Sequence, residues 1–271
     1  MSKIPLLILI LIGFLQGISL SFIYLLPILI FSYYFFLKKI IFSQTTKESF
    51  YIGWCFGFGF FLGSMHWIIS PFLIYDRHFY LSPLVIIIFP LLMGVFFSIH
   101  SVLISEFKKR FDLTDGNFLF SKSFFISLCF FFTEVLRSTI FGGLPFNLTA
   151  HIWAFQSELI QIAKFLGVFG LSFLTINWIV LVSFNFFSKK IKSSFIILFF
   201  FPTFLISLDA FLDMVHKKES NNEKITLRVV QPNIPQIDKW NRLYFQDNLE
   251  KLIDLSKDKN QSDKKKNCNM A

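Results

Sequence analysis

Thr133-Glu134-Val135-Leu136-Arg137, followed by Gly142-Gly143-Leu144-Pro145-Phe146-Asn147, is the stretch around which this chain is organised. It places a carboxylate and a guanidinium at the end of an apolar run, residues 123–132, and then interrupts the helix with Gly-Gly-x-Pro. Charges at membrane depth are costly, so they usually face a polar cavity or each other. Glu134 and Arg137 are three residues apart and can pair on one helix face. Two interpretations stay open, a local ion pair with snorkelling side chains or the wall of a substrate cleft.

The composition indicates a polytopic membrane protein. Of the 271 residues, 54% are hydrophobic and 16% are charged, and the mean hydropathy is +0.61. A net charge of +9 would also fit nucleic-acid binding. However, the basic residues lie between apolar segments and in a C-terminal tail, which favours orientation signals and contact with anionic lipid. We therefore expect a membrane partner and no nucleic acid.

The three cysteines form no recognisable site. Cys55 and Cys129 lie inside apolar runs, where a thiol usually packs as a small hydrophobic group, and Cys268 lies in a Lys/Asn-rich tail. None has the spacing of a metal ligand. The sequence therefore predicts no metal and no cofactor.

Seven apolar segments approach the roughly 20 residues that a membrane-spanning helix needs. The first two share one long run, which we divide near Gly17, Ser19 and Ser21, and we interpret the first as a retained span instead of a signal peptide. The fold class is thus an α-helical polytopic membrane protein whose bundle covers residues 1–215. The predicted spans are 4–20, 21–37, 50–74, 80–105, 122–138, 166–188 and 193–214.

The basic residues predict the orientation of the bundle. With a cytoplasmic N-terminus, the outer loops carry only Arg77, Arg137 and Lys164, and an odd number of spans puts everything after about residue 215 outside the cytoplasm. The inner loops then carry Lys3, Lys38, Lys39, Lys47, Lys108, Lys109, Arg110, Lys122, Lys189, Lys190 and Lys192.

Glycines mark the third span, and a long loop follows the fifth. Glycines at 53, 57, 59 and 63 favour close helix packing, while His66 is an alternative functional group near the outer interface, beside an interfacial Trp67. The connection 141–166 is long and contains Trp153, so we expect it to lie on or dip into the outer leaflet. The alternative is an amphipathic surface helix that serves only as an anchor.

The composition changes after the last span. Residues 216–224 form a charged linker, 225–231 alternate as a β-strand does, 241–256 have helical spacing, and 257–271 form a polar tail predicted to be disordered. One strand and one helix are too little to fold alone. The pattern therefore indicates the first strand and helix of an α/β domain.

Together, these parts resemble the apolipoprotein N-acyltransferases of the bacterial inner membrane. Phe146 stands where the family usually has tryptophan. The stretches that carry the resemblance are Gly53–Gly59 with His66-Trp67, Thr133–Arg137 with Gly143–Phe146, Gly167–Phe173, and Val230–Gln236 with Lys239-Trp240. The last stretch resembles the opening of the family's nitrilase-like domain, so the resemblance implies that 225–256 is an N-terminal fragment of that domain.

The resemblance implies transfer of an acyl chain from phospholipid, through a cysteine thioester, to the amino group of a diacylglyceryl-cysteine on a lipoprotein. It further implies a multi-pass protein of the bacterial inner membrane with residues after about 215 in the periplasm. Substrate contacts are then expected from Trp240, Glu134 and Arg137; a tryptophan that caps the strand–helix turn is the alternative for Trp240.

No residue matches the family's catalytic Glu, Lys and Cys, so the resemblance implies a C-terminally truncated enzyme without catalytic residues of its own. A second chain would then carry the rest of the nitrilase-like domain. The alternative is a non-catalytic lipid-binding or scaffold subunit of a split acyltransferase. A transporter is disfavoured, because the sequence has no inverted repeat.

Overall fold

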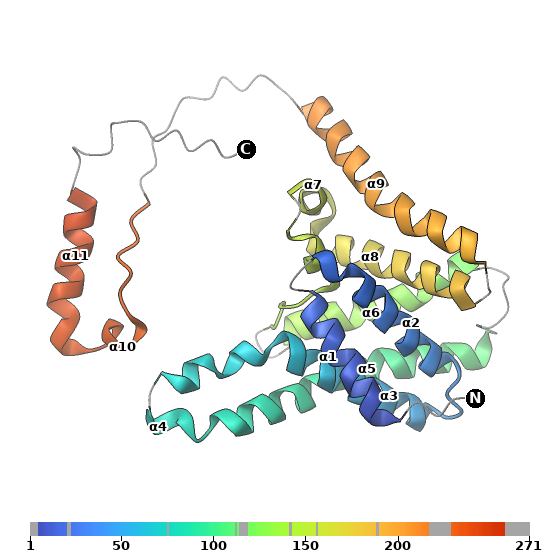
Figure 1. Cartoon of the computed structure of the whole chain (residues 1–271), viewed down its shortest axis with the longest axis horizontal. Coiled ribbons are helices and arrows are strands. Elements are labelled where there is room, and N and C mark those ends of the chain that lie inside the picture. The colour runs from blue at the N-terminus through green and yellow to red at the C-terminus, as the bar shows by residue number, and fades with distance from the viewer. Residues whose placement is uncertain are drawn as a thin grey trace. The chain divides into compact units, whose positions relative to one another are not determined.

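A computed structural model describes residues 5–20, 23–74, 76–111, 113, 119–140, 143–155, 157–187, 190–216 and 229–257 (Figure 1). Within these ranges the regular structure is helical and contains no β-strand. The chain divides into two units, Met1–Ile69 with Pro83–Lys218 and Ser70–Ser82 with Glu219–Ala271.

Within the described residues, seven long helices each overlap one predicted span. They are α1 (Leu6–Ser19), α2 (Leu26–Ile41), α3 (Thr46–Ser64), α5 (Ser82–Arg110), α6 (Leu119–Thr139), α8 (Ala163–Phe187) and α9 (Ile191–His216). The shorter elements are η1 (Ile23–Leu25), η2 (His66–Leu73), α4 (Asp76–Phe79), η4 (Thr149–Trp153) and α7 (Ser157–Ile160).

Three of the described helical stretches are long and apolar enough to cross a membrane, namely Arg77–Arg110, Ala163–Phe187 and Ile191–Leu212. A fourth span arises if α3 and η2 count as one span bent by 51°. The helices α1 and α2 have only 14 and 16 residues. The structure therefore supports an α-helical membrane protein, and the total of seven spans stays a prediction.

Helix α3 lies between α1 and α5, and its glycines explain how. A Cβ atom at Gly59 or Gly63 would meet a backbone carbonyl of α1, and one at Gly53 or Gly57 would meet the backbone of α5 around residues 94–98. The backbones thus approach too closely for any side chain at these four positions. The predicted packing role of the glycines is confirmed.

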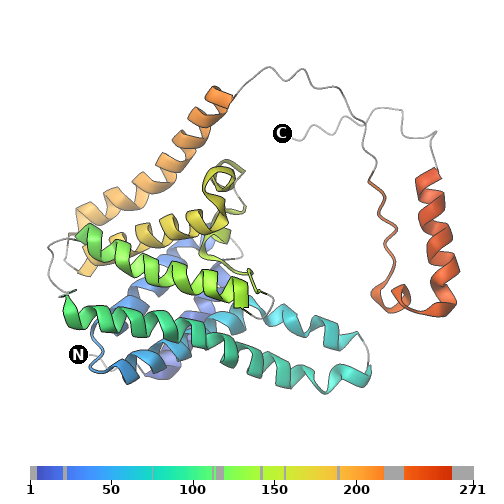
Figure 2. The same cartoon turned by 180° about the vertical axis from the view of Figure 1, so that it is seen from behind.

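Helix α8 contains a break at its fifth residue, Gly167. Gly167 has φ 68° and ψ 165°, a conformation open essentially only to glycine, and it separates the first turn from the long remainder. Figure 2 shows that remainder, in yellow, packed beside α6 in light green. The pair α6 and α8 frames the loop described below.

Basic side chains tie one end of the bundle together. Lys108 of α5 donates a hydrogen bond to the carbonyl of Ser43, at 2.5 Å, in the turn between α2 and α3. Lys109 binds Thr46 at 2.8 Å, and Lys39 lies 4.0 Å from Glu48. Loops predicted to be on the inner side therefore lie together, which satisfies one requirement of the predicted orientation.

The second unit contains three short helical elements near the C-terminus. They are α10 (Gln236–Lys239), η5 (Arg242–Tyr244) and α11 (Phe245–Lys257), and α11 confirms the helix predicted over 241–256. Only residues 229–231 of the predicted strand are described, and they are not in a strand. A strand needs a partner for its backbone groups, and the described residues offer none. The predicted linker beyond His216 and the tail beyond Lys257 lie outside the described residues.

Candidate functional site

The candidate site is the loop that follows α6, and it begins with a tight reversal at Gly143. Gly143 has φ 85°, and a Cβ atom there would meet the carbonyl oxygen of Ser138. Its N–H donates to the carbonyl of Ile140 at 2.9 Å, and the N–H of Leu144 donates to the carbonyl of Arg137 at 3.1 Å. The glycine predicted to end the helix therefore does so, because only glycine fits this close approach.

Arg137 holds the loop through its carbonyl oxygens. Its Nη1 donates to the carbonyl of Leu144 at 2.6 Å and to that of Phe146 at 2.7 Å, and its guanidinium lies 5.5 Å from the centre of the Phe61 ring. Only 5% of Arg137 is exposed. A buried guanidinium with two carbonyl acceptors and an aromatic face is satisfied locally. It fixes the backbone of residues 144–146 against α6 and α3.

Glu134 holds the same loop from one turn earlier on α6. Its Oε1 accepts hydrogen bonds from the backbone N–H of Thr149, at 3.0 Å, and from the Thr149 hydroxyl, at 2.8 Å. Thr149 is the first residue of η4, so the carboxylate caps the start of that helix, where an acceptor and a negative charge are both favourable. Tyr33 of α2 adds a contact to the same hydroxyl at 3.1 Å.

Further contacts carry the loop into the bundle. Asn147, with φ 54°, donates through Nδ2 to the carbonyl of Ser64 at 3.1 Å. The N–H of Ala150 donates to Ser172 Oγ at 3.0 Å, and Trp153 Nε1 donates to Thr175 Oγ1 at 2.8 Å. Asparagine tolerates this left-handed conformation better than most residues. Trp153 is buried, so the loop packs into the helix bundle, and its predicted place at the outer leaflet stays a prediction.

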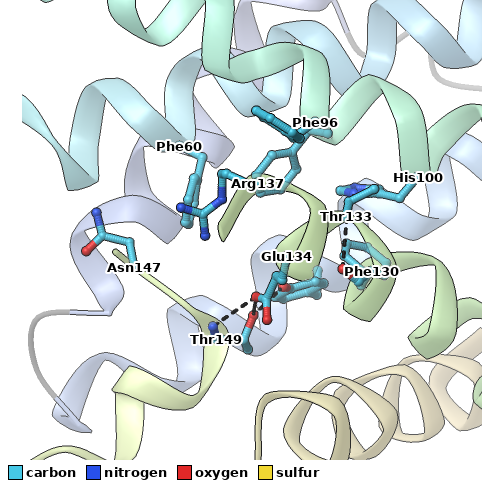
Figure 3. Close-up of a pocket in the computed structure, with 11 residues that line it drawn as sticks. Phe60, Phe96, His100, Phe130, Thr133, Glu134, Arg137, Asn147 and Thr149 are labelled. Carbon is cyan, nitrogen blue, oxygen red and sulfur yellow. Dashed lines mark hydrogen bonds between the residues drawn. The ribbon is translucent and has the colours of Figure 1, made fainter. Parts of the chain in front are cut away.

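A cavity of about 20 Å³ adjoins these anchors (Figure 3). It is lined by Glu134, Arg137 and Thr149 together with His100 and Tyr33. Glu134 Oε2 and His100 Nε2 are buried and have no hydrogen-bond partner among the described residues. The volume suits about one water-sized group. The cavity is therefore too small for a lipid headgroup or an acyl chain.

His100 is a polar residue that the sequence analysis did not single out. It is 2% exposed on α5, its Nδ1 lies 3.2 Å from Thr133 Oγ1, and its ring lies 4.0 Å from that of Phe130. Tyr33 was missed in the same way. A histidine within an apolar span was itself a signal, since polar groups at membrane depth are rare and often functional.

One of the two open interpretations, a direct ion pair between Glu134 and Arg137, does not match the contacts of these side chains. Among the contacts of the described residues, their side chains bind different parts of the loop and form no ion pair within 4.0 Å. The loop offers carbonyl acceptors to the guanidinium and N–H and O–H donors to the carboxylate, and these partners match each group individually. Figure 3 shows the Glu134 carboxylate bound to Thr149 and the Arg137 side chain next to Phe60. Their predicted contact with a substrate stays a prediction.

The other predicted residues lie elsewhere. Trp240 is 77% exposed in the second unit, where it ends α10 through its N–H to Asp238, and its role stays a prediction. His66 Nδ1 lies 3.1 Å from the carbonyl of Gly63 at the end of α3. Cys55 and Cys129 are free thiols, and Cys268 lies outside the described residues. In the described part of the chain, no three His, Cys, Asp or Glu side chains form a group able to hold a metal ion.

Two residues of the loop, Phe146 and His151, are influenced by neighbouring side chains. Phe146 meets the Trp67 ring edge-on at 5.6 Å between ring centres. His151 lies in η4, outside the predicted spans. Burial lowers the pKa of His151, and the positive charge of Arg137 lowers it further.

Comparison with known proteins identifies the family. Residues 12–184 match the family described as the apolipoprotein N-acyltransferase N-terminal domain. The chain belongs to this family. Residues 133–153, with both anchors and the loop, lie within the matched range. The proposed relation of residues 230–240 to a nitrilase-like domain lies beyond it.

Curated relatives extend the match along the chain. The chain is 30% identical over 252 residues to the apolipoprotein N-acyltransferase of Rickettsia bellii and 32% identical over 257 residues to that of Rickettsia prowazekii. Each alignment covers 91% of this chain and 48% of the relative. The Brucella suis enzyme is 24% identical over 220 residues, covering 76% of this chain and 38% of that protein. The chain thus spans about half the length of the curated relatives it matches.

Proposed function

We propose that residues 1–215 form the membrane part, and residues 225–256 the start of the nitrilase-like domain, of a phospholipid:apolipoprotein N-acyltransferase. In this proposal the acyl chain passes from a phospholipid to the N-terminal diacylglyceryl-cysteine of a lipoprotein, at the inner membrane, with the N-terminus cytoplasmic and residues after about 215 periplasmic. The observation that carries the proposal is the family match over residues 12–184. It contains the Glu134 and Arg137 anchors and the loop that they hold.

Glu134 and Arg137 are given a positioning role in this function. Their polar atoms face the loop backbone, and the adjoining cavity of about 20 Å³ has no room for a lipid. They set the shape of residues 143–153, so that exposed Phe146, together with the neighbouring Trp67 of η2, offers an aromatic surface to lipid or peptide. Interfacial aromatic residues favour such contacts. Trp240, also exposed, is proposed as a further substrate contact.

We assign no catalytic residue to these 271 residues. The resemblance implies a thiolate that attacks the phospholipid ester, releases a lysophospholipid and forms a thioester. The lipoprotein amine then attacks the thioester and releases the thiol. No residue of the chain matches the family's Glu, Lys or Cys, so these groups come from a further region or a second chain. Helix α11 fits this proposal, because its apolar residues Leu249 and Leu252 are more than one third exposed.

The test is acyl transfer in phospholipid vesicles that contain a diacylated lipopeptide, with mass spectrometry as the readout. The 271-residue chain alone should give no triacylated product. Addition of the C-terminal half of the Rickettsia bellii relative should restore product, and Arg137→Met should reduce it. Product from the chain alone would overturn the absence of catalytic residues. Lipopeptide binding without product in either arm would favour the scaffold alternative.

A further inference from the structure

An apolar groove of about 740 Å³ lies between α2 and α9. Both helices pack against α8, which contributes Phe186 to the groove. We call this space the α2–α9 groove; its lining includes Leu26, Ile30 and Tyr34 of α2 and Leu198 and Phe199 of α9. All these side chains are apolar apart from the Tyr34 hydroxyl. The groove is large enough for a lipid chain, since ligand sites commonly fall between about 300 and 1,000 Å³.

The length of the groove matches one leaflet of a bilayer. On α9 it extends from Ile191 to Pro202, which is roughly 17 Å of helix at a rise of about 1.5 Å per residue. Half of the hydrocarbon core of a bilayer is about 15 Å. A transmembrane helix would need about twice that length. The dimensions therefore favour a single acyl chain over a helix as the occupant.

Lysines gather at one end of the groove. The Lys38 ammonium lies 5.5 Å from the centre of the Tyr34 ring, one helical turn beyond the groove lining. Tyr34 in turn packs on Phe187 at 4.9 Å, at the end of α8, and exposed Lys190 and Lys192 flank Ile191 at the start of α9. Neither α2 nor the first turn of α9 carries a carboxylate. Among the described residues, Lys38, Lys190 and Lys192 have no carboxylate within 4.0 Å, whereas neighbouring Lys39 lies 4.0 Å from Glu48, so this end is a cationic rim.

We propose that the α2–α9 groove binds an anionic phospholipid, with an acyl chain along the groove and the phosphate at Lys38, Lys190 and Lys192. Basic pockets between membrane helices suit anionic headgroups, and the adjoining apolar wall suits the chain. The lysines belong to the loops predicted to be cytoplasmic. Trp153 and the rest of the loop that Glu134 holds pack at other parts of α8. The lipid is therefore separate from the proposed acyl donor, and its binding does not depend on acyl transfer.

The test is retention of lipid by the purified 271-residue chain, measured by native mass spectrometry in detergent. Phosphatidylglycerol and phosphatidylethanolamine with identical acyl chains are the probes. The chain should retain phosphatidylglycerol preferentially, and Lys38→Gln with Lys192→Gln should weaken that binding roughly 5- to 25-fold. The matched control, Lys47→Gln with Arg110→Gln, removes the same charge from exposed positions away from the groove. It should change binding by less than about twofold.

A second pair of variants tests the apolar half of the site. Ile30→Trp fills the groove and should reduce the retention of both lipids. Leu92→Trp, at a side chain 61% exposed on α5, is the matched control and should leave retention unchanged. Equal retention of the two wild-type lipids, or equal losses in test and control variants, would overturn the proposal. The proposal would also be overturned if the purified chain retained no lipid and Ile30→Trp altered its oligomeric state. That result would assign the groove to contact with a second copy of the chain.

Discussion

Glu134 accepts two hydrogen bonds from Thr149, fifteen residues further along the chain, through a single carboxylate oxygen. Glu134→Ala should remove the acceptor of the Thr149 N–H and leave that buried donor without its partner, at a cost of about 1–3 kcal/mol in the free energy of unfolding. Glu134→Gln retains a carbonyl oxygen and should cost less. The measurement is the melting temperature of each purified variant in detergent.

The control for this prediction is Glu106→Ala. Glu106 lies on the exposed surface, bound to Lys109 at 2.6 Å. Its loss should change the melting temperature little, since exposed ion pairs contribute little to stability. Equal destabilisation by Glu134→Ala and Glu106→Ala would contradict the capping role of Glu134.

Arg137 and Glu134 should be coupled even though they do not pair. Arg137→Met leaves the carbonyls of Leu144 and Phe146 without their donor and should cost about 2–3 kcal/mol in the free energy of unfolding. Both side chains hold one loop, so the double variant should cost less than the sum of the single variants. Limited proteolysis within residues 143–153 should rise in each single variant. Strict additivity in the melting temperatures would argue against a shared loop.

The stability of the chain should depend on pH through His151. Its pKa in the folded chain is below the ordinary value of about 6.5, because burial and Arg137 disfavour the imidazolium. Between the folded and unfolded pKa values the unfolded chain binds more protons, so stability rises with pH. The contribution of His151 to the free energy of unfolding is therefore complete above about pH 6.5. It is lost as the pH falls through the pKa of His151 in the folded chain. His151→Gln should reduce the fall in melting temperature between pH 7 and pH 5 relative to wild type. An unchanged dependence of the melting temperature on pH would contradict this role of His151.

The helices and the glycine packing were predictable because they depend on properties that the sequence carries locally. An apolar run needs a helix in a membrane whatever its neighbours are, and glycines at 53, 57, 59 and 63 permit close approach to any helix. The partners of Glu134 were not predictable from spacing. The i,i+3 relation favours Arg137, but the loop supplies donors for one group and acceptors for the other.

The contacts of His100 were missed for the same reason, because they depend on tertiary structure. His100 meets Thr133 and Phe130 across two helices, and an isolated histidine in a run does not reveal which residues it will face. The strand predicted at 225–231 stays a prediction, since only residues 229–231 are described, and a strand also needs a neighbouring strand that the sequence pattern cannot supply by itself. Local pattern thus sets the elements, while partners depend on how the helices assemble.

Gly59 and Gly167 should both resist substitution, for different reasons. Gly59→Ala would bring a Cβ atom against the carbonyl of Ile10 in α1 and force the two helices apart, at a cost of about 1–3 kcal/mol. Gly167→Ala meets no atom within 4 Å, but its φ of 68° strains the new residue by about 1–3 kcal/mol. Cysteine cross-linking between α1 and α3 should weaken only in Gly59→Ala. Loss of cross-linking in both variants would contradict this distinction.

Phe146 should accept tryptophan but not alanine. Its ring is 47% exposed and meets Trp67 edge-on, so a larger indole has room toward solvent or lipid. Phe146→Trp should leave the melting temperature within the range of a neutral substitution, whereas Phe146→Ala loses an aromatic pair worth about 0.5–1.5 kcal/mol. Phe120→Ala, at a ring 67% exposed, is the matched control and should have little effect. If Phe146→Trp proved as damaging as Phe146→Ala, the position would be more tightly enclosed than the Trp67 contact implies, and the aromatic surface proposed for the loop would have to be abandoned.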